Sequence, residues 1–349
     1  MTQSPVYFKS ASTPYAKDAL HLAVKKLMDR VDVIERGDVV AIKLHMGERG
    51  NTGHIRPIFV RMIVDFVKER KGKPFLTDTT TLYGGHRGNA IDYLMTAAMN
   101  GFSISSMNCP IIIADGLRGN EEVHVEMNGE RIAIARAIYE ADCMIVLSHF
   151  KGHGMAGFGG AIKNLGMGCC SRAGKLWQHE VSKPLHDDSK CILCLECLQF
   201  CPADAIFEEN GKIGIDYEKC RGCGACTVLC EQGCFSLSEE MWKKFQQRVA
   251  MAAAAAAKKF DGKVAFLNFL MDITPRCDCC SFAGKPVVND MGILSSRDAV
   301  AIDRACYDMV CREYGKDVFM DIHGIDGTIQ IKEAEKVGLG KAAYSLTEI

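Results

Sequence analysis

Two short runs of cysteine with identical spacing constrain this chain more than any other feature. The first run is Cys191-x2-Cys194-x2-Cys197-x3-Cys201-Pro202, and the second is Cys220-x2-Cys223-x2-Cys226-x3-Cys230. Each cysteine of the second run lies 29 positions after its counterpart in the first run. This repeat indicates an internal duplication of one metal-binding unit, which we place within residues 183–237.

The spacing within each run fits a cubane iron–sulfur cluster. Three thiolates two residues apart can hold one cluster, and the fourth cysteine of such a run ligates the other cluster. We therefore predict two [4Fe–4S] clusters, one held by Cys191, Cys194, Cys197 and Cys230, and one held by Cys220, Cys223, Cys226 and Cys201. A zinc ribbon is the alternative, but zinc takes four ligands in one site, and two matched sets of four suit cubanes better.

The repeat resembles the bacterial two-cluster ferredoxins over about 55 residues. One departure is Glu231, which stands where the first run has Pro202 and changes the turn but not the ligand. Cys234 aligns with Ala205 in the repeat, so we interpret it as a small packing residue. The resemblance implies a segment that carries electrons.

Composition places these cysteines in a reducing compartment. The chain has 349 residues, 18 cysteines and a net charge of −1. We see neither an export signal nor an apolar run long enough to span a membrane, so we expect a cytoplasmic protein. Cytosolic thiols stay reduced, which favours metal binding over disulfides. No basic stripe suggests nucleic-acid binding.

The remainder of the chain alternates between apolar strands and amphipathic helices. Predicted strands are Val39–Leu44, Phe75–Thr79, Ile111–Ala114, Cys143–Leu147 and Val264–Leu270, with a hairpin at Asn128-Gly129. Predicted helices begin at Pro57, near Asn89, after a capping box at Ser236-x-x-Glu239, and near Arg297. This pattern predicts an α/β fold with a mostly parallel sheet flanked by helices. Residues 1–182 and 238–349 would form it, interrupted by the ferredoxin-like insertion at 183–237.

Three loops rich in glycine and histidine follow predicted strands, at residues 45–54, 78–87 and 148–163. Ligands of open α/β sheets bind beyond the carboxyl ends of the strands. We therefore predict one pocket for a small anionic substrate, and Lys43 is a further candidate anion ligand. The candidate catalytic residues are His45, His86, His149, Lys151, His153 and Lys163.

Two further resemblances cover this region. The stretch from His153 to Lys163 is similar to a loop of nickel-pincer lactate racemases, although Ala161 and Ile162 depart from that pattern. In that family the histidine acts in acid/base chemistry and the lysine anchors the cofactor, which implies these roles for His153 and Lys163. Together with the cluster motifs, residues 164–175, 277–280 and 290–294 resemble a prokaryotic family of Fe–S centre proteins, the domain of unknown function 362. That resemblance implies the two-part architecture but no substrate.

A third metal or redox site is predicted at Cys277, Cys279 and Cys280, which lie within four residues of one another. Such a density of thiolates suits a soft or borderline metal, and Cys169, Cys170 or His179 could complete the shell. The alternative is a set of small buried side chains, because free cysteine packs well. Cys109, Cys143, Cys306 and Cys311 lie in apolar patterns and are predicted core residues.

Three functions remain open at this point. The first is an oxidoreductase that receives electrons from a redox partner protein and passes them through the clusters to a small anionic substrate or bound cofactor. The second is a non-enzymatic electron carrier for a partner reductase. The third is a racemase-like or lyase-like enzyme with structural clusters.

Overall fold

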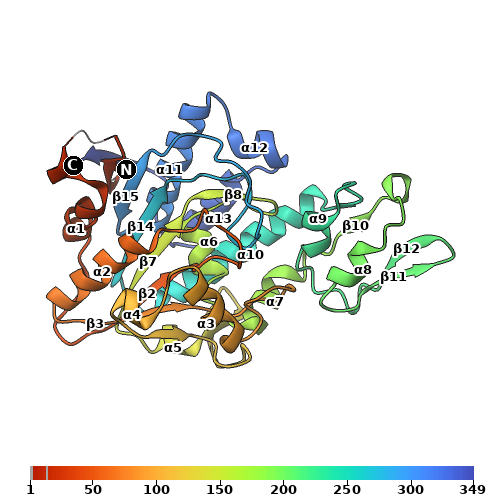
Figure 1. Ribbon diagram of the computed structural model, residues 1–349, viewed down its shortest axis with the longest axis horizontal. Helices are drawn as coiled ribbons and strands as arrows, with labels where there is room; N and C mark the ends of the chain where they lie inside the picture. The colour runs from red at the N-terminus through yellow and green to blue at the C-terminus, as the bar shows by residue number, and fades with distance from the viewer. Residues whose placement is uncertain (1–2, 13–14) are drawn as a thin grey trace.

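The computed structural model describes residues 3–12 and 15–349, and an eight-stranded sheet forms its centre (Figure 1). The strand order is β16-β1-β15-β14-β7-β2-β3-β4. Their bounds are β1 Ser4–Ser10, β2 Val39–Leu44, β3 Lys73–Asp78, β4 Ile111–Ile113, β7 Cys143–His149, β14 Val264–Leu270, β15 Gly292–Ser296 and β16 Tyr344–Glu348. Only β15 runs antiparallel to its neighbours within this sheet. The predicted, mostly parallel sheet is confirmed.

Helices cover both faces of the sheet. One face carries α1 Leu20–Arg30, α2 Pro57–Glu69, α3 Ala90–Met99 and α4 Ile104–Met107; the other carries α6 Ala161–Gly166, α10 Glu239–Lys258, α11 Ala299–Tyr314 and α13 Thr328–Lys336. Strand β7 shows why both faces are covered, because Met144 and Val146 enter one core whereas Ile145 and Leu147 enter the other. Such a strand, buried on both sides, is apolar along most of its length, here over residues 143–147.

The smaller elements fill the connections. They are η1 Ala16–Asp18, the hairpin β5 Glu122–Met127 and β6 Glu130–Ala135, α5 Arg136–Tyr139, the pair β8 Lys151–His153 and β9 Gly157–Gly159, α7 Arg172–His179 and α12 Val318–His323. The hairpin turns at Asn128-Gly129, as predicted, with both residues at positive φ. No helix in the described part of the chain is long and apolar enough to cross a membrane.

The long helix α10 packs closely along its C-terminal half, because its buried face there is made of alanine. Its alanines lie in the core against α6, where a Cβ on Gly166 would come within 2.3 Å of the Val249 carbonyl oxygen. The N-cap differs from the prediction. Ser238, not Ser236, accepts the backbone N–H of Met241, while Ser236 ends a short strand. The predicted capping box was therefore two residues too early.

The ferredoxin-like insertion leaves and rejoins the α/β domain at one place. Strands β10 Leu185–His186 and β13 Phe235–Ser236 pair antiparallel and bring its two ends together. Between them lie η2 Asp188–Lys190, α8 Glu196–Phe200, β11 Ile206–Glu209, β12 Lys212–Ile215 and α9 Ala225–Leu229. Figure 1 shows this segment projecting from one side of the sheet domain. Its own small core contains Ile206, Ile213, Cys234 and Phe235.

Asp303 of α11 fixes the start of α6. Its carboxylate accepts the backbone N–H groups of Ala161 at 2.7 Å and Ile162 at 2.9 Å, and the Asn268 amide at 2.7 Å. Replacing Asp303 with alanine leaves these buried donors unpaired, so we expect the free energy of unfolding to fall by about 3 kcal/mol. Denaturant unfolding measures this loss. Asp303→Asn keeps an acceptor oxygen and should lose less stability. Equal stability of Asp303→Ala and the wild type would show that Asp303 does not fix the start of α6.

Candidate functional site

A cavity of about 540 Å³ lies beyond the carboxyl ends of β2, β3 and β7. Parallel strands place these ends at one edge of the sheet, so residues far apart in sequence meet there. From the α/β domain the lining includes Lys43, His45, Asp78, His149, Lys151, His153, Lys163, Lys175, His179, Cys277, Cys279 and Cys280. The insertion supplies Cys223, Gly224, Thr227, Val228, Phe235 and Ser236. The cavity is therefore shared between the two parts of the chain.

Five of the six candidate catalytic residues line this cavity, namely His45, His149, Lys151, His153 and Lys163. His86 does not. Its side chain is 51% exposed and lies 3.4 Å from Glu48 at the surface. The loop at residues 78–87 contributes Asp78 and Arg87 to the cavity in place of His86.

Two buried carboxylates beside the cavity are already neutralised. Lys43 Nζ lies 2.9 Å from Asp78 Oδ1 and 2.6 Å from the Asn164 amide oxygen. Burial alone would raise the pKa of Asp78, but the charges of Lys43, His45 and Arg87 hold it at about 2. Lys43 is therefore occupied by an ion pair and is not available to an anionic ligand.

Asp278 is the second neutralised carboxylate. Its Oδ1 lies 2.7 Å from His149 Nδ1, and its Oδ2 lies 3.5 Å from Lys151 Nζ. Burial would raise the pKa of Asp278, but these two neighbours hold it far below its usual range. His149 Nε2 faces the carbonyl oxygen of Asp272 at 3.0 Å, so both ring nitrogens meet acceptors. Neither ring nitrogen of His149 is therefore free to contact a ligand in the cavity.

Lys163 is the lysine of the cavity that remains available. Lys151 donates to the His149 carbonyl oxygen at 2.8 Å, and Lys175 donates to Thr79 and to the Cys170 carbonyl oxygen. Within residues 3–12 and 15–349, Lys163 Nζ has neither a hydrogen-bond nor an ion-pair partner. Burial is the main cause that lowers the pKa of His153 well below its usual value and the pKa of His179 to about 4, and the charge of Lys163 adds to both shifts. Both histidines are therefore neutral near pH 7.

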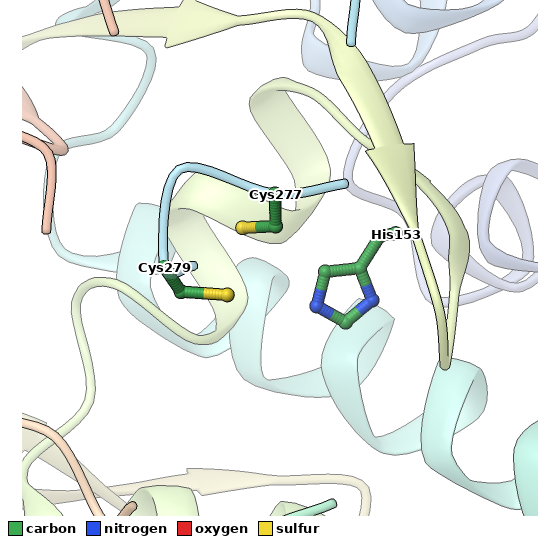
Figure 2. A group of neighbouring side chains, drawn as sticks. All are labelled: His153, Cys277 and Cys279. Atoms are coloured by element: carbon green, nitrogen blue, oxygen red, sulfur yellow. The ribbon is translucent and has the colours of Figure 1, made fainter. Parts of the chain in front are cut away.

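His153 faces two cysteines. Its Nδ1 accepts the backbone N–H groups of Met155 and Ala156, each at 3.2 Å. The ring points toward the sulfurs of Cys277 and Cys279, and the three candidate ligand atoms lie within 4.8 Å of one another (Figure 2).

The predicted partners of the cysteine cluster lie elsewhere or make other contacts. Cys169 and Cys170 are buried in the core, where burial raises their pKa to about 11 and 12. His179 hydrogen-bonds the Gly222 carbonyl oxygen at 3.1 Å. The resemblance to the racemase loop implied acid/base chemistry for His153, whereas the structure places this ring beside Cys277 and Cys279.

The cluster cysteines surround two small cavities in the insertion. One, of about 100 Å³, is lined by Cys191, Cys194, Cys197 and Cys230, and Cys226 and Cys234 also border it. The other, of about 20 Å³, is lined by Cys201, Cys220, Cys223 and Cys226. Each cavity thus gathers the first three cysteines of one run and the fourth of the other. This is the grouping that cubane ligation requires.

The two cluster loops share one backbone shape but differ in their surroundings. Leu193 and Leu195 of the first loop, and Gly222 and Gly224 of the second, all have positive φ at matching repeat positions. A Cβ on Gly222 would come within 2.1 Å of the His179 carbonyl oxygen, and one on Gly224 within 2.8 Å of Met155 Sδ. Glycine is therefore required where the second loop packs on α7 and on the cavity. The first loop is exposed and accommodates leucine.

A protein-family model described as "Domain of unknown function (DUF362)" matches residues 40–308. The chain belongs to the DUF362 family. The match extends on both sides of the insertion, and so includes the strands and loops that form the cavity.

Curated relatives match the DUF362 chain over shorter stretches. The pyruvate synthase subunit PorD of Thermotoga maritima is 34% identical over 83 residues, which are 24% of this chain and 81% of that protein. PorD of Methanothermobacter marburgensis is 34% identical over 86 residues, 25% of this chain and 99% of that protein. The indolepyruvate oxidoreductase subunit IorA of the same organism is 49% identical over 47 residues, 14% of this chain but 8% of that protein. The DUF362 chain is thus an iron–sulfur protein with a ferredoxin-like segment that is similar to oxidoreductase subunits.

Among solved structures, the DUF362 chain is similar to the lactate racemase apoprotein from Thermoanaerobacterium thermosaccharolyticum. The TM-score is 0.46 and the sequence identity is 13%. The similarity covers 89% of this chain, which spans 58% of the racemase chain.

Proposed function

We propose that this protein accepts electrons from a redox partner protein and delivers them, through two [4Fe–4S] clusters, to a small anionic substrate or cofactor in the cavity. One observation carries the proposal: Cys223 of the second cysteine run lines the same cavity as Lys163 and His153. The proposed cluster site that contains Cys223 would therefore be adjacent to the proposed anion site. The α/β domain then acts as a binding site for the molecule that is reduced.

Each cluster would be held by one of the two cysteine sets, and bound clusters would supply one-electron redox chemistry. The set with Cys194 lies on the exposed loop, whereas the set with Cys223 packs against the cavity. With one cysteine set at the exposed loop and the other at the cavity, electrons can enter at the loop and leave at the cavity.

The surface around the exposed loop supports a protein partner. Ile192, Leu193, Leu195 and Phe200 are all exposed there, by 66%, 41%, 41% and 44%. Exposed apolar side chains that gather in this way are typical of interaction sites. The relatives are named as subunits of pyruvate synthase, indolepyruvate oxidoreductase and ketoisovalerate oxidoreductase. These names share a 2-oxoacid, so we propose an enzyme that acts on a 2-oxoacid as the partner.

The charges of the cavity favour an anion. Asp78 and Asp278 are neutralised by their own partners, while Lys163 lacks one within the described residues. Lys175 adds a second lysine, which is buried, to the same cavity, whereas Lys151 is already paired with Asp278. A carboxylate or phosphate would therefore meet a net positive surface, and Lys163 would be its first direct contact.

Replacing Lys163 with alanine tests this anion site. A hydrogen bond to a charged group contributes about 1.5–3 kcal/mol, so we expect the affinity for oxalate to fall about 10- to 100-fold. Isothermal titration calorimetry measures the change. Lys163→Arg keeps the charge and should keep most of the affinity, and iron content should be the same in all three proteins. Unchanged oxalate binding in Lys163→Ala would contradict the anion site.

The alternative functions predict other outcomes. Clusters reduced with dithionite should be reoxidised by an anionic acceptor from a panel of carboxylates and phosphates if the protein is an oxidoreductase. Reoxidation by a partner protein and by no small anion would instead support the electron carrier. Interconversion or cleavage of a substrate with no change in the clusters would support the racemase-like or lyase-like alternative.

A further inference from the structure

We propose that His153, Cys277 and Cys279 bind one borderline divalent metal ion, with Zn²⁺ as the representative, at the wall of the cavity. The inference rests on the cavity assigned above but not on electron transfer through the clusters. The ligand atoms of the three residues lie within 4.8 Å of one another, although they come from separate segments, β8 and the loop after β14 (Figure 2). None of the three belongs to the two cysteine sets of the insertion.

The donor set suits this class of ion. Thiolate sulfur and imidazole nitrogen are the usual ligands of zinc, and three protein ligands with one open position are typical of catalytic zinc sites. Asp278 lies between the two cysteines in sequence, but its carboxylate is directed to other groups, with Oδ1 2.7 Å from His149 Nδ1 and Oδ2 3.5 Å from Lys151 Nζ. The fourth position would therefore open to the cavity that all three ligands line.

The surrounding contacts hold the ligands in place without a metal. Cys277 and Cys280 close a turn in which the Cys280 N–H donates to the Cys277 carbonyl oxygen at 2.9 Å. The Asn51 amide donates to the Cys280 carbonyl oxygen at 2.9 Å. Strand β8 lies so close to this loop that a Cβ on Gly152 would come within 2.1 Å of the Pro275 carbonyl oxygen. The segments that carry the imidazole and the thiols are therefore packed together.

The position of the His153 ring determines the kind of site. Because Nδ1 accepts two backbone N–H groups, Nε2 is the nitrogen left for a metal, and it carries the ring proton while no metal is bound. Metal-binding histidines usually donate their second N–H to an acceptor, which strengthens them as ligands. His153 lacks that support, so we infer an exchangeable ion and not a closed structural site. Metal removal by a chelator should therefore leave the fold intact.

An ion at this position would act on the same molecule as Lys163. Its open face and the Lys163 ammonium group border one cavity, so an anion with an oxygen donor, such as a carboxylate, can contact both. The ion would supply Lewis-acid polarisation of that oxygen. We therefore assign the ligand of the cavity to the class of anions that offer an oxygen donor.

The test uses the full-length protein with its clusters, loaded with Zn²⁺ under anaerobic conditions. Zinc affinity is measured by competition with a chelating dye, and the ligands are measured by X-ray absorption at the zinc edge, where cluster iron does not contribute. We expect about one bound zinc per chain with two sulfurs at about 2.3 Å and a nitrogen at about 2.0–2.1 Å. Cys277→Ser and His153→Ala should each weaken binding about 100-fold or more. Cys311→Ser, a half-buried cysteine of α11, is the matched control and should bind zinc as the wild type does.

Two results would overturn the metal site. One is the absence of zinc binding in wild-type protein whose iron content is complete. The other is a zinc spectrum that is the same in the wild type, Cys277→Ser and His153→Ala. Because the wild-type spectrum identifies the ligands by itself, the test does not depend on folding of the variants. Either result leaves the electron-transfer proposal unchanged. A wild-type protein that binds zinc but contains no iron would instead contradict the two clusters and leave the zinc site unchanged.

Discussion

Replacing Cys223 with serine is expected to lower the iron content from about eight to about four atoms per chain, as one of two cubanes is lost. Cys223 lines the smaller cluster cavity and the large cavity at once, so the variant should lose the cluster next to the anion site. Electrons would then still enter at the exposed loop but would not reach the cavity. Reoxidation of the reduced protein by an anionic acceptor should cease.

Iron and sulfide analysis of anaerobically purified protein measures this effect. Cys234→Ala is the matched control, because Cys234 lies in the same insertion and borders the first cysteine cavity from the small core, but is not one of the eight predicted ligands. It should keep its full iron content. If Cys223→Ser keeps about eight irons, or if Cys234→Ala loses as much iron as Cys223→Ser, the assignment of ligands to clusters is wrong.

Replacing Lys43 with methionine is expected to lower the free energy of unfolding by about 3–5 kcal/mol, because it leaves the Asp78 carboxylate buried without its closest cation. Lys43 and Asp78 are almost fully buried, with side chains 1% and 5% exposed. Lys25→Met is the control. Lys25 pairs with Glu69 at the surface, and removal of such a pair costs about 0–1 kcal/mol. Similar losses in the two variants would contradict the importance of the buried pair.

The same pair makes stability depend on pH. The pKa of Asp78 is lowered to about 2 in the folded protein, against 3.8 for the free side chain. An acid with a lowered pKa contributes stability that is present above the unfolded pKa and is lost as the pH falls through the folded pKa. We expect about 2 kcal/mol to be lost between pH 4 and pH 2. Unfolding measured across this range should show a smaller acid loss in Lys43→Met, and an equal loss would contradict the assignment.

Local pattern predicted the fold class and five of the eight strands of the sheet, but not β1, β15 and β16. The alternation of apolar strands and helices gave the parallel sheet, and the Asn128-Gly129 turn gave the hairpin, because both depend on residues close in sequence. The helix start at Ser236 was wrong because two serines stand near Glu239, and only Ser238 has its side chain at the Met241 N–H. Such a choice depends on where the preceding strand ends.

The composition of the site was harder to predict, because it depends on which loops meet. His153 and Cys277 are far apart in sequence, and only the packing of β8 on the loop after β14 brings them together. Lys43 was a candidate anion ligand, but its pairing with Asp78 across β2 and β3 could not be read from either strand alone. The glycines of the second cluster loop did offer a signal. Their difference from Leu193 and Leu195 marks the loop that packs against the cavity.

The central claim is that one of two clusters lies beside an anion site. Electron paramagnetic resonance of the dithionite-reduced protein, recorded with and without oxalate, tests it most directly. The account predicts that oxalate changes the signal of one cluster, the one that is lost in Cys223→Ser, and that Lys163→Ala abolishes this change. A signal that is insensitive to oxalate, or a change confined to the cluster that survives in Cys223→Ser, would contradict the account.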